Sequence, residues 1–193
     1  MTLICGIDEA GRGPLCGPVF ASAVILDSND EHLNNLADSK KLSEKNRISI
    51  YEQIKLKAVD FSFANASVEE IDRINILQAS LLAMKRAFEL LKIKPDCIFV
   101  DGIYCPEIKN ILMKSIPKGD SLIPAISAAS IIAKVERDRY MVDLDQKYPQ
   151  YNLKKHKGYP TKEHIKLIKQ YGVKEIHRLS FKPIKELIYK KDT

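Results

Sequence analysis

The sequence predicts an α/β protein in which helices flank a mixed β-sheet and a small helical segment follows at the C-terminus. Two apolar, β-branched runs, residues 3–7 and 19–26, stand on either side of a loop rich in glycine and proline, which is typical of neighbouring antiparallel strands. Residues 97–100 form a short continuous apolar run of the kind found in strands buried on both faces. An antiparallel start beside a parallel strand gives a mixed sheet covered by helices.

Capping residues and periodicity define the other elements. Ser43 is a plausible N-cap, and Ser67 with Glu70 forms a capping box at the start of a long helix whose apolar residues repeat at a/d spacing. We expect this long helix to be the main core helix. The further predicted elements are helices over residues 44–57, 68–92, 125–147, 162–171 and 184–190, strands over 61–64 and 111–116, and a loop over 151–159.

Length and charge favour one main domain with a basic tail. The chain has 193 residues and a formal net charge of +6. Residues 154–193 contain twelve Lys or Arg and only four acids, so the excess positive charge lies there. We therefore divide the chain into a main domain over residues 1–150 and a basic helical segment over 151–193. A basic tail beside a near-neutral body fits a clamp for a polyanion, and a solvated lysine-rich surface is the alternative.

Cysteine usage and the N-terminal residues favour a cytoplasmic protein. The four cysteines, at positions 5, 16, 97 and 105, include no C-x-x-C pair, so we expect reduced thiols and no zinc site. Asp8, Glu9 and Arg12 stand where a signal peptide would need apolar residues, and no apolar run approaches transmembrane length.

The loop over residues 6–18 is the first candidate site. It places the adjacent carboxylates Asp8 and Glu9 beside Gly11, Arg12 and Gly13, where a backbone or a phosphate can approach closely. Because strand side chains alternate, both acids can serve one site only if the strand bends, and Ala10–Gly11 allows a bend. A solvated turn is the alternative. The spacing matches neither a dinucleotide-binding motif nor a P-loop.

Two further acids follow predicted strands. Asp101 directly follows the apolar run over residues 97–100 and is followed by Gly102. Open α/β sheets commonly have their active sites at the carboxyl ends of such strands. Asp120 follows Gly119 and has two readings: a site residue, or a turn aspartate that caps the next helix.

These segments resemble the type 2 ribonuclease H family. The resemblance spans most of the chain, and its motifs lie over residues 6–19, 38–42, 101–102, 118–120, 126–134 and 156–159. It implies a ribonuclease H-like fold, with Asp8, Glu9, Asp101 and Asp120 as the catalytic and metal-binding residues. Phosphodiester hydrolysis can use two divalent ions, and a carboxylate set without Cys or His suits Mg²⁺ or Mn²⁺.

The resemblance also implies the substrate. It points to an endonuclease that hydrolyses the RNA strand of RNA/DNA hybrids and nicks DNA on the 5′ side of embedded ribonucleotides, leaving 3′-hydroxyl and 5′-phosphate ends. In the family, a tyrosine matching Tyr159 combines with the loop Gly11–Arg12–Gly13 to recognise the RNA-to-DNA junction; the alternative for Tyr159 is a half-buried loop aromatic. Further candidate contacts to phosphate or to the strand are Ser39, Lys40, Asn75, Gln78 and Lys134.

Two rival functions remain open. The type 3 ribonuclease H family shares the core, but it carries an N-terminal extension and has Glu at the last acidic position, where this chain has Asp120. A nucleic-acid-binding protein without catalysis would explain the basic tail but not four acids. We expect a monomer and find no sliding-clamp peptide near the C-terminus. The histidines of the tail, including His156, are expected at the surface or at a phosphate.

Overall fold

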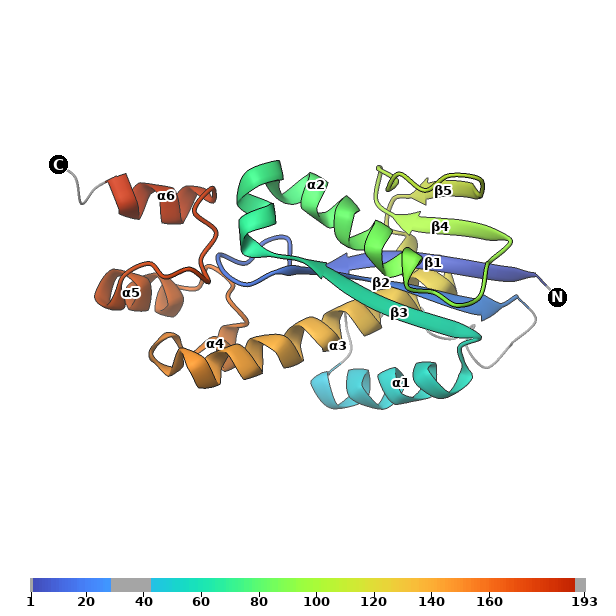
Figure 1. Cartoon of the computed structure of the whole chain (residues 1–193). Coiled ribbons are helices and arrows are strands. Elements are labelled where there is room, and N and C mark those ends of the chain that lie inside the picture. The colour runs from blue at the N-terminus through green and yellow to red at the C-terminus, as the bar shows by residue number, and fades with distance from the viewer. Residues whose placement is uncertain (1, 29–42, 190–193) are drawn as a thin grey trace.

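The computed structural model describes residues 2–28 and 43–189, and it contains a five-stranded mixed sheet in the order β3-β2-β1-β4-β5 (Figure 1). The strands are β1 (Leu3–Ala10), β2 (Val19–Asp27), β3 (Asp60–Ala66), β4 (Cys97–Asp101) and β5 (Leu112–Ile116). β1 pairs with β2, and β2 with β3, in antiparallel fashion, whereas β4 is parallel to both β1 and β5. The predicted mixed sheet is confirmed.

Helices cover both faces of the sheet. α2 lies on one face, α1 and α3 lie on the other, and the C-terminal helices lie beyond the end toward which β1 and β4 point (Figure 1). The helices are α1 (Glu44–Lys57), α2 (Val68–Glu89), α3 (Pro124–Lys147), α4 (Leu153–His156), α5 (Lys162–Tyr171) and α6 (Lys182–Tyr189), with short 3₁₀ turns η3 (Gly119–Ser121) and η4 (Pro149–Tyr151). The predicted cap at Ser43 and the predicted capping box at Ser67 are present, and Thr161 caps α5. None of the helices in the described part of the chain is long and apolar enough to span a membrane.

α2 is not the uninterrupted core helix that its sequence predicts. It breaks at Asn75, which has φ 67° and ψ 165°, and it ends at Glu89. The Oδ1 atom of Asn75 accepts hydrogen bonds from the N–H groups of Leu77 and Gln78, so Asn75 caps the second part of the helix. α3 is the more central helix, because thirteen of its residues are buried against six in α2.

Two apolar cores lie on opposite faces of the sheet. Cys5, Ile7 and Val100 belong to the core under α2, whereas Val24 belongs to the core under α1 and α3. At Gly6 the backbone of α3 comes so close to β1 that an added Cβ would lie 2.0 Å from the carbonyl carbon of Ala125. The small residues at the start of α3 therefore bring this helix directly onto β1.

A third core joins the loop after β1 to the C-terminal segment. Leu15 and Cys16 pack with residues of α3, α5 and α6, and Cys16 forms an isolated antiparallel bridge with His177. Residues 151–159, predicted as a loop, instead contain α4 and the end of η4. All four cysteines are free thiols, as predicted. The division into a domain over residues 1–150 and a segment over 151–193 stays a prediction.

The tail histidines are buried, so their predicted surface position is wrong. His156 and His164 stack with ring centroids 4.3 Å apart, and His164 lies 5.8 Å from His177. His177 in turn meets the ring of Tyr151 edge-on. Burial lowers the pKa of both His164 and His177 to about 4. The rings serve as uncharged packing groups between the loop and the tail.

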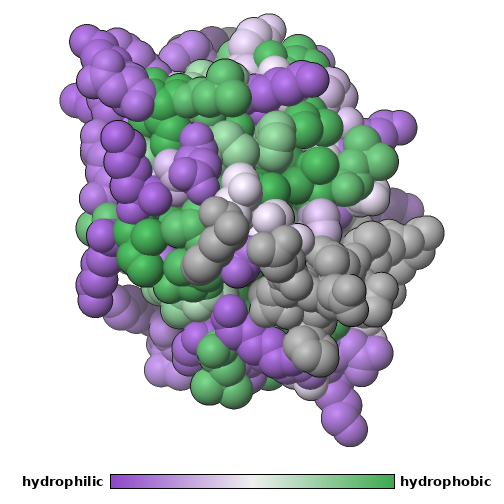
Figure 2. All heavy atoms as spheres, turned by 90° about the vertical axis from the view of Figure 1, so that its right-hand side faces the viewer, coloured by the Kyte–Doolittle hydropathy of each residue, from purple (hydrophilic) through white to green (hydrophobic). Residues whose placement is uncertain are grey.

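The opposite end of the molecule, which carries the N-terminus, shows apolar areas between hydrophilic ones (Figure 2). Leu90 and Leu112 are among the exposed apolar side chains of the protein, and Leu112 belongs to the edge strand β5. The basic tail lies at the other end (Figure 1).

We expect Gly6→Ala to destabilise the protein by about 1–3 kcal/mol, because the added methyl group meets rigid backbone rather than a flexible side chain. Urea denaturation measures the free energy of unfolding. Gly13→Ala is the matched control, since its nearest new neighbour is Cε1 of Tyr159 at 3.7 Å. Similar free energies for the two variants would contradict close packing at Gly6.

Acidification should destabilise the fold between pH about 6.5 and 4. In this window the unfolded histidines bind protons while buried His164 and His177, with pKa values of about 4, do not, so each lowers the free energy of unfolding by up to about 1.4 kcal/mol per pH unit as the pH falls. Urea denaturation from pH 7 to 4.5 measures the slope. His164→Asn removes one titrating group and should flatten it, and an unchanged slope would exclude His164 as the cause.

Candidate active site

Asp8 and Asp101 lie side by side at the carboxyl ends of two parallel strands. The register of β1 and β4 pairs Ile7 with Val100, and both side chains belong to the core under α2. The next residue in each strand therefore points to the opposite face, toward α3. This places both carboxylates at one edge of the sheet, as the strand-end pattern predicts.

Glu9 joins this pair although β1 does not bend between the two acids. Its backbone stays in the ladder with β2 as far as Ala10, and the left-handed conformation appears only at Gly11, which has φ 98°. Glu9 lies near the end of the strand, and its carboxylate accepts a hydrogen bond from Arg12 at 3.2 Å. The chain therefore turns at Gly11, within the predicted Ala10–Gly11 bend and after both acids.

Asp120 lies in the 3₁₀ turn η3, directly after Gly119, which forms a hydrogen bond with Asp101. The N–H group of Gly119 donates to Oδ1 of Asp101 at 2.7 Å, and Asp120 is buried with 2% of its surface exposed. The N-cap of α3 is Ile123, whose side chain makes no capping bond. Asp120 is therefore not the N-cap residue of α3.

The acids repel one another in a buried setting. Burial raises the pKa of Asp8 well above its ordinary value, and the charges of Glu9 and Asp101 raise it further, against a hydrogen bond from Ser130. Burial also raises the pKa of Glu9, which Arg12 lowers and Asp101 raises. A cation among these carboxylates would relieve both penalties.

The donor set suits a hard divalent cation in kind, because it consists of carboxylate oxygens alone. Among residues 2–28 and 43–189, however, no three Asp, Glu, His or Cys side chains already form a ligand group for a metal ion. A cation would have to draw these side chains together.

One hollow of about 250 Å³ connects Glu9, one of the four acids, to three of the predicted substrate-binding residues. Glu9, Gly11, Lys134 and Tyr159 all line it. The ring of Tyr159 is 41% exposed, and its Cε1 atom lies 3.7 Å from the position of a Cβ on Gly13. Tyr159 is therefore a half-exposed wall of the hollow beside the glycine loop.

Two polar residues that line the hollow were not predicted as site residues from the sequence. Ser130 hydrogen-bonds Asp8 and lines the hollow, and Arg47 of α1 lines it from the other side. The sequence signal for Ser130 is its place in the family motif over residues 126–134. Lys134 lies one turn after Ser130 and pairs with Asp138 at 2.8 Å.

The other predicted substrate contacts are not among the described residues that line this hollow. Ser39 and Lys40 lie outside the described residues. Asn75 and Gln78 do not line the hollow that contains Glu9 and Tyr159. Asn75 serves as a helix cap, and Gln78 lines a separate hollow with Cys105 and Glu107.

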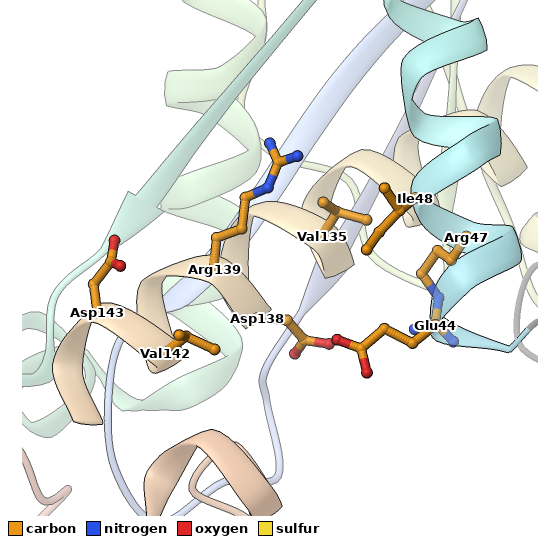
Figure 3. Close-up of a pocket in the computed structure, with 8 residues that line it drawn as sticks. All are labelled: Glu44, Arg47, Ile48, Val135, Asp138, Arg139, Val142 and Asp143. Atoms are coloured by element: carbon orange, nitrogen blue, oxygen red, sulfur yellow. The ribbon is translucent and has the colours of Figure 1, made fainter. Parts of the chain in front are cut away.

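A neighbouring pocket between α1 and α3 contains none of the predicted site residues (Figure 3). Ile48, Val135 and Val142 line it together with acids and arginines, and Arg47 is the residue that it shares with the candidate site. The exposure of Ile48, at 42%, reflects this pocket.

Comparisons with known proteins identify the family of this chain. The family model Ribonuclease HII matches residues 5–184. A ribonuclease HII of Vibrio parahaemolyticus is 52% identical over 96% of this chain and 87% of its own length. The crystal structure of a ribonuclease H2 from Pyrococcus horikoshii is 28% identical over the whole of both chains, with a TM-score of 0.84. The ribonuclease HII in a PCNA complex from Archaeoglobus fulgidus is 26% identical over 93% of this chain and 95% of its own, with a TM-score of 0.76. The chain therefore belongs to the ribonuclease HII family and is a ribonuclease H-type nuclease.

Proposed function

We propose that this enzyme hydrolyses the RNA strand of RNA/DNA hybrids and nicks DNA on the 5′ side of an embedded ribonucleotide, leaving 3′-hydroxyl and 5′-phosphate ends. The observation that carries the proposal is the shared hollow, in which Glu9 of the acid set faces Gly11 and Tyr159. Such an arrangement can hold a reacting phosphate and inspect the neighbouring sugar in one place.

Asp8, Glu9, Asp101 and Asp120 would hold two divalent ions, Mg²⁺ or Mn²⁺. Bound there, such ions supply an activated water and stabilise the leaving oxygen of an in-line displacement. The chain itself contributes the arrangement of the carboxylates. Ser130 holds Asp8 by a hydrogen bond, and the Gly119 N–H group holds Asp101.

The substrate would be recognised through its sugar and its phosphates. Arg12 and Gly13 are exposed beside the buried Gly11, so their backbone is accessible to a 2′-hydroxyl, and the exposed Tyr159 offers its ring as a surface for the next sugar. Lys134 and Arg137 lie about the same distance from the Tyr159 ring, at 5.8 and 5.9 Å from its centroid, and their charges favour a phosphate near it.

Two other proposals have less support. The match of the ribonuclease HII family model from residue 5 to residue 184 argues against the type 3 family. A purely binding protein leaves the buried, mutually repelling acids unexplained. Cleavage of a labelled hybrid that depends on Mg²⁺ or Mn²⁺ would exclude it. Ribonucleotide repair, a cytoplasmic location, a monomeric state and the absence of a clamp peptide stay predictions.

Asp101→Asn should abolish nearly all cleavage while folding and nucleic-acid binding persist. The amide oxygen can still accept the hydrogen bond from Gly119, but the neutral group holds a cation poorly. The measurement is cleavage of a duplex with one ribonucleotide at saturating Mg²⁺, mapped to the bond. Asp143→Asn, at an exposed acid of α3, is the control. Near-normal turnover of the Asp101 variant would remove Asp101 from the site.

Substitutions at Tyr159 should cause graded losses on a duplex with a single ribonucleotide. Tyr159→Phe keeps the ring and loses a hydrogen bond worth roughly 0.5–1.5 kcal/mol, whereas Tyr159→Ala loses both. The penalty for Ala should be smaller on a continuous hybrid, where several riboses position the strand. The ratio of kcat/KM on the two substrates measures the effect.

Tyr171 provides the matched control for Tyr159, since its ring is 45% exposed in the same tail but does not line the hollow. Tyr171→Phe should leave both substrates unaffected. Equal penalties for Tyr159→Ala on both substrates would show that Tyr159 only supports the loop.

A further inference from the structure

The glycine loop after β1 is held in place by residues far away in the sequence. The N–H group of Gly17 donates to Ile176 at 2.9 Å, and the N–H group of Arg178 donates to Leu15 at 2.8 Å. On the other side, the N–H group of Leu15 donates to Gly158 at 2.8 Å. The conformation of the loop therefore depends on the C-terminal segment.

The guanidinium group of Arg178 binds three carbonyl oxygens of this loop. It donates to Gly11 from Nη2 at 2.7 Å, to Arg12 from Nη1 at 2.9 Å and to Gly17 from Nε at 2.9 Å. The side chain is fully buried, so a basic residue of the predicted polyanion clamp lies in the interior. The guanidinium presents its donors as a rigid planar fork that can fix several carbonyls at once, whereas the donors of a lysine share one nitrogen on a flexible stem.

These bonds orient the peptide groups of the loop. The peptide bonds of this loop, like the others in the described part of the chain, are all trans, so each N–H group points away from the carbonyl of the same peptide unit. Because the carbonyls of Gly11 and Arg12 face Arg178, the N–H groups of Arg12 and Gly13 face the opposite way, away from the buried guanidinium. Two successive N–H groups on one side form a concave site for an oxygen atom. Gly17 is followed by Pro18, which has no N–H group to orient.

Neighbouring contacts hold both Arg178 and the loop. A Cβ on Gly11 would lie 2.0 Å from Nε of Arg137, so the loop rests directly on this second buried arginine. Behind Arg178, the carboxylate of Asp72 accepts hydrogen bonds from the N–H groups of Leu179 and Ser180, both at 2.9 Å. These contacts fix the chain that carries Arg178 to α2.

We propose that Arg178 is a positioning residue for ribose recognition: its guanidinium holds the carbonyls of Gly11 and Arg12 so that the N–H groups of Arg12 and Gly13 face the 2′-hydroxyl or the adjacent phosphate of a bound ribonucleotide. This inference rests on the proposed function, in which the same loop reads the sugar. Arg178 acts through the loop and does not touch the substrate.

The test compares binding to two duplexes of the same sequence, one with a single ribonucleotide and one of DNA alone, in the absence of divalent ions. Arg178→Met keeps most of the side-chain length and loses the donors. We expect its affinity ratio between the two duplexes to fall at least fivefold, while its affinity for the DNA duplex changes less than twofold. Arg178→Lys keeps the positive charge on a single nitrogen, and its affinity ratio should lie between those of Arg178→Met and the wild-type protein.

A spectroscopic measurement reports the loop without any substrate. The chain has only 8 glycines, so ¹⁵N-glycine labelling gives a simple amide spectrum. Arg178→Met and Arg178→Lys should shift the signals of Gly11, Gly13 and Gly17 far more than that of Gly102. Tyr151→Phe is the matched control, because it removes a 2.7 Å hydrogen bond to Gly172 in the same tail without a bond to the loop. Its duplex ratio and loop signals should equal those of wild type.

The outcomes separate this inference from the proposed function. If the wild-type protein does not distinguish the two duplexes, the proposed function fails. If it does, and Arg178→Lys shows the wild-type ratio and wild-type glycine signals, the role of Arg178 is refuted, even where Arg178→Met does not fold. Equal losses on both duplexes for either folded variant would also refute it, because they would indicate a general structural defect.

Discussion

The close contact between β1 and the start of α3 is the constraint on which the site depends. It requires glycine at position 6, where no Cβ fits against Ala125. On the neighbouring strand β2, the hydroxyl of Ser22 also holds α3 on the sheet by donating to the carbonyl of Ala129 at 2.8 Å. With the helix this close, Ser130 reaches Asp8, and Lys134 and Arg137 follow on the same face of α3, one and two turns later. One packing contact thus places a positioning group beside the acids and two cations beside Tyr159.

The sequence predicts most of the fold because its signals are local. The strands follow from short β-branched and apolar runs, and the caps at Ser43, Ser67 and Thr161 fix three helix starts through bonds within four residues. Asp8 and Asp101 are predictable for the same reason, since each follows an apolar run and parallel strands end at one edge. Resemblance to the family, rather than periodicity, was needed for Asp120 and Tyr159, which lie in a turn and a loop.

One error arises where one local signal conceals another, and the others arise where long-range contacts override local patterns. Asn75 interrupts an otherwise helical repeat, although Asn followed three residues later by Gln78 is itself a helix-start signal that the a/d repeat concealed. The tail histidines and Arg178 look like members of a basic surface. Their burial depends on Cys16, Tyr151 and the loop carbonyls, and the carbonyl of Arg12 is 166 residues from Arg178. No window of sequence contains that information.

The two buried arginines are costly, and stability alone gives no reason for them. Burial, together with the nearby charge of Arg137, lowers the pKa of Arg178 to about 9. Replacing buried ionic groups by apolar side chains of similar volume is often neutral or stabilising. An apolar residue at position 178, however, would leave the carbonyls of Gly11 and Arg12 free to turn. The N–H groups of Arg12 and Gly13 would then no longer be held on one side of the loop. The charge is therefore best understood through the geometry that it imposes on the loop beside Asp8 and Tyr159.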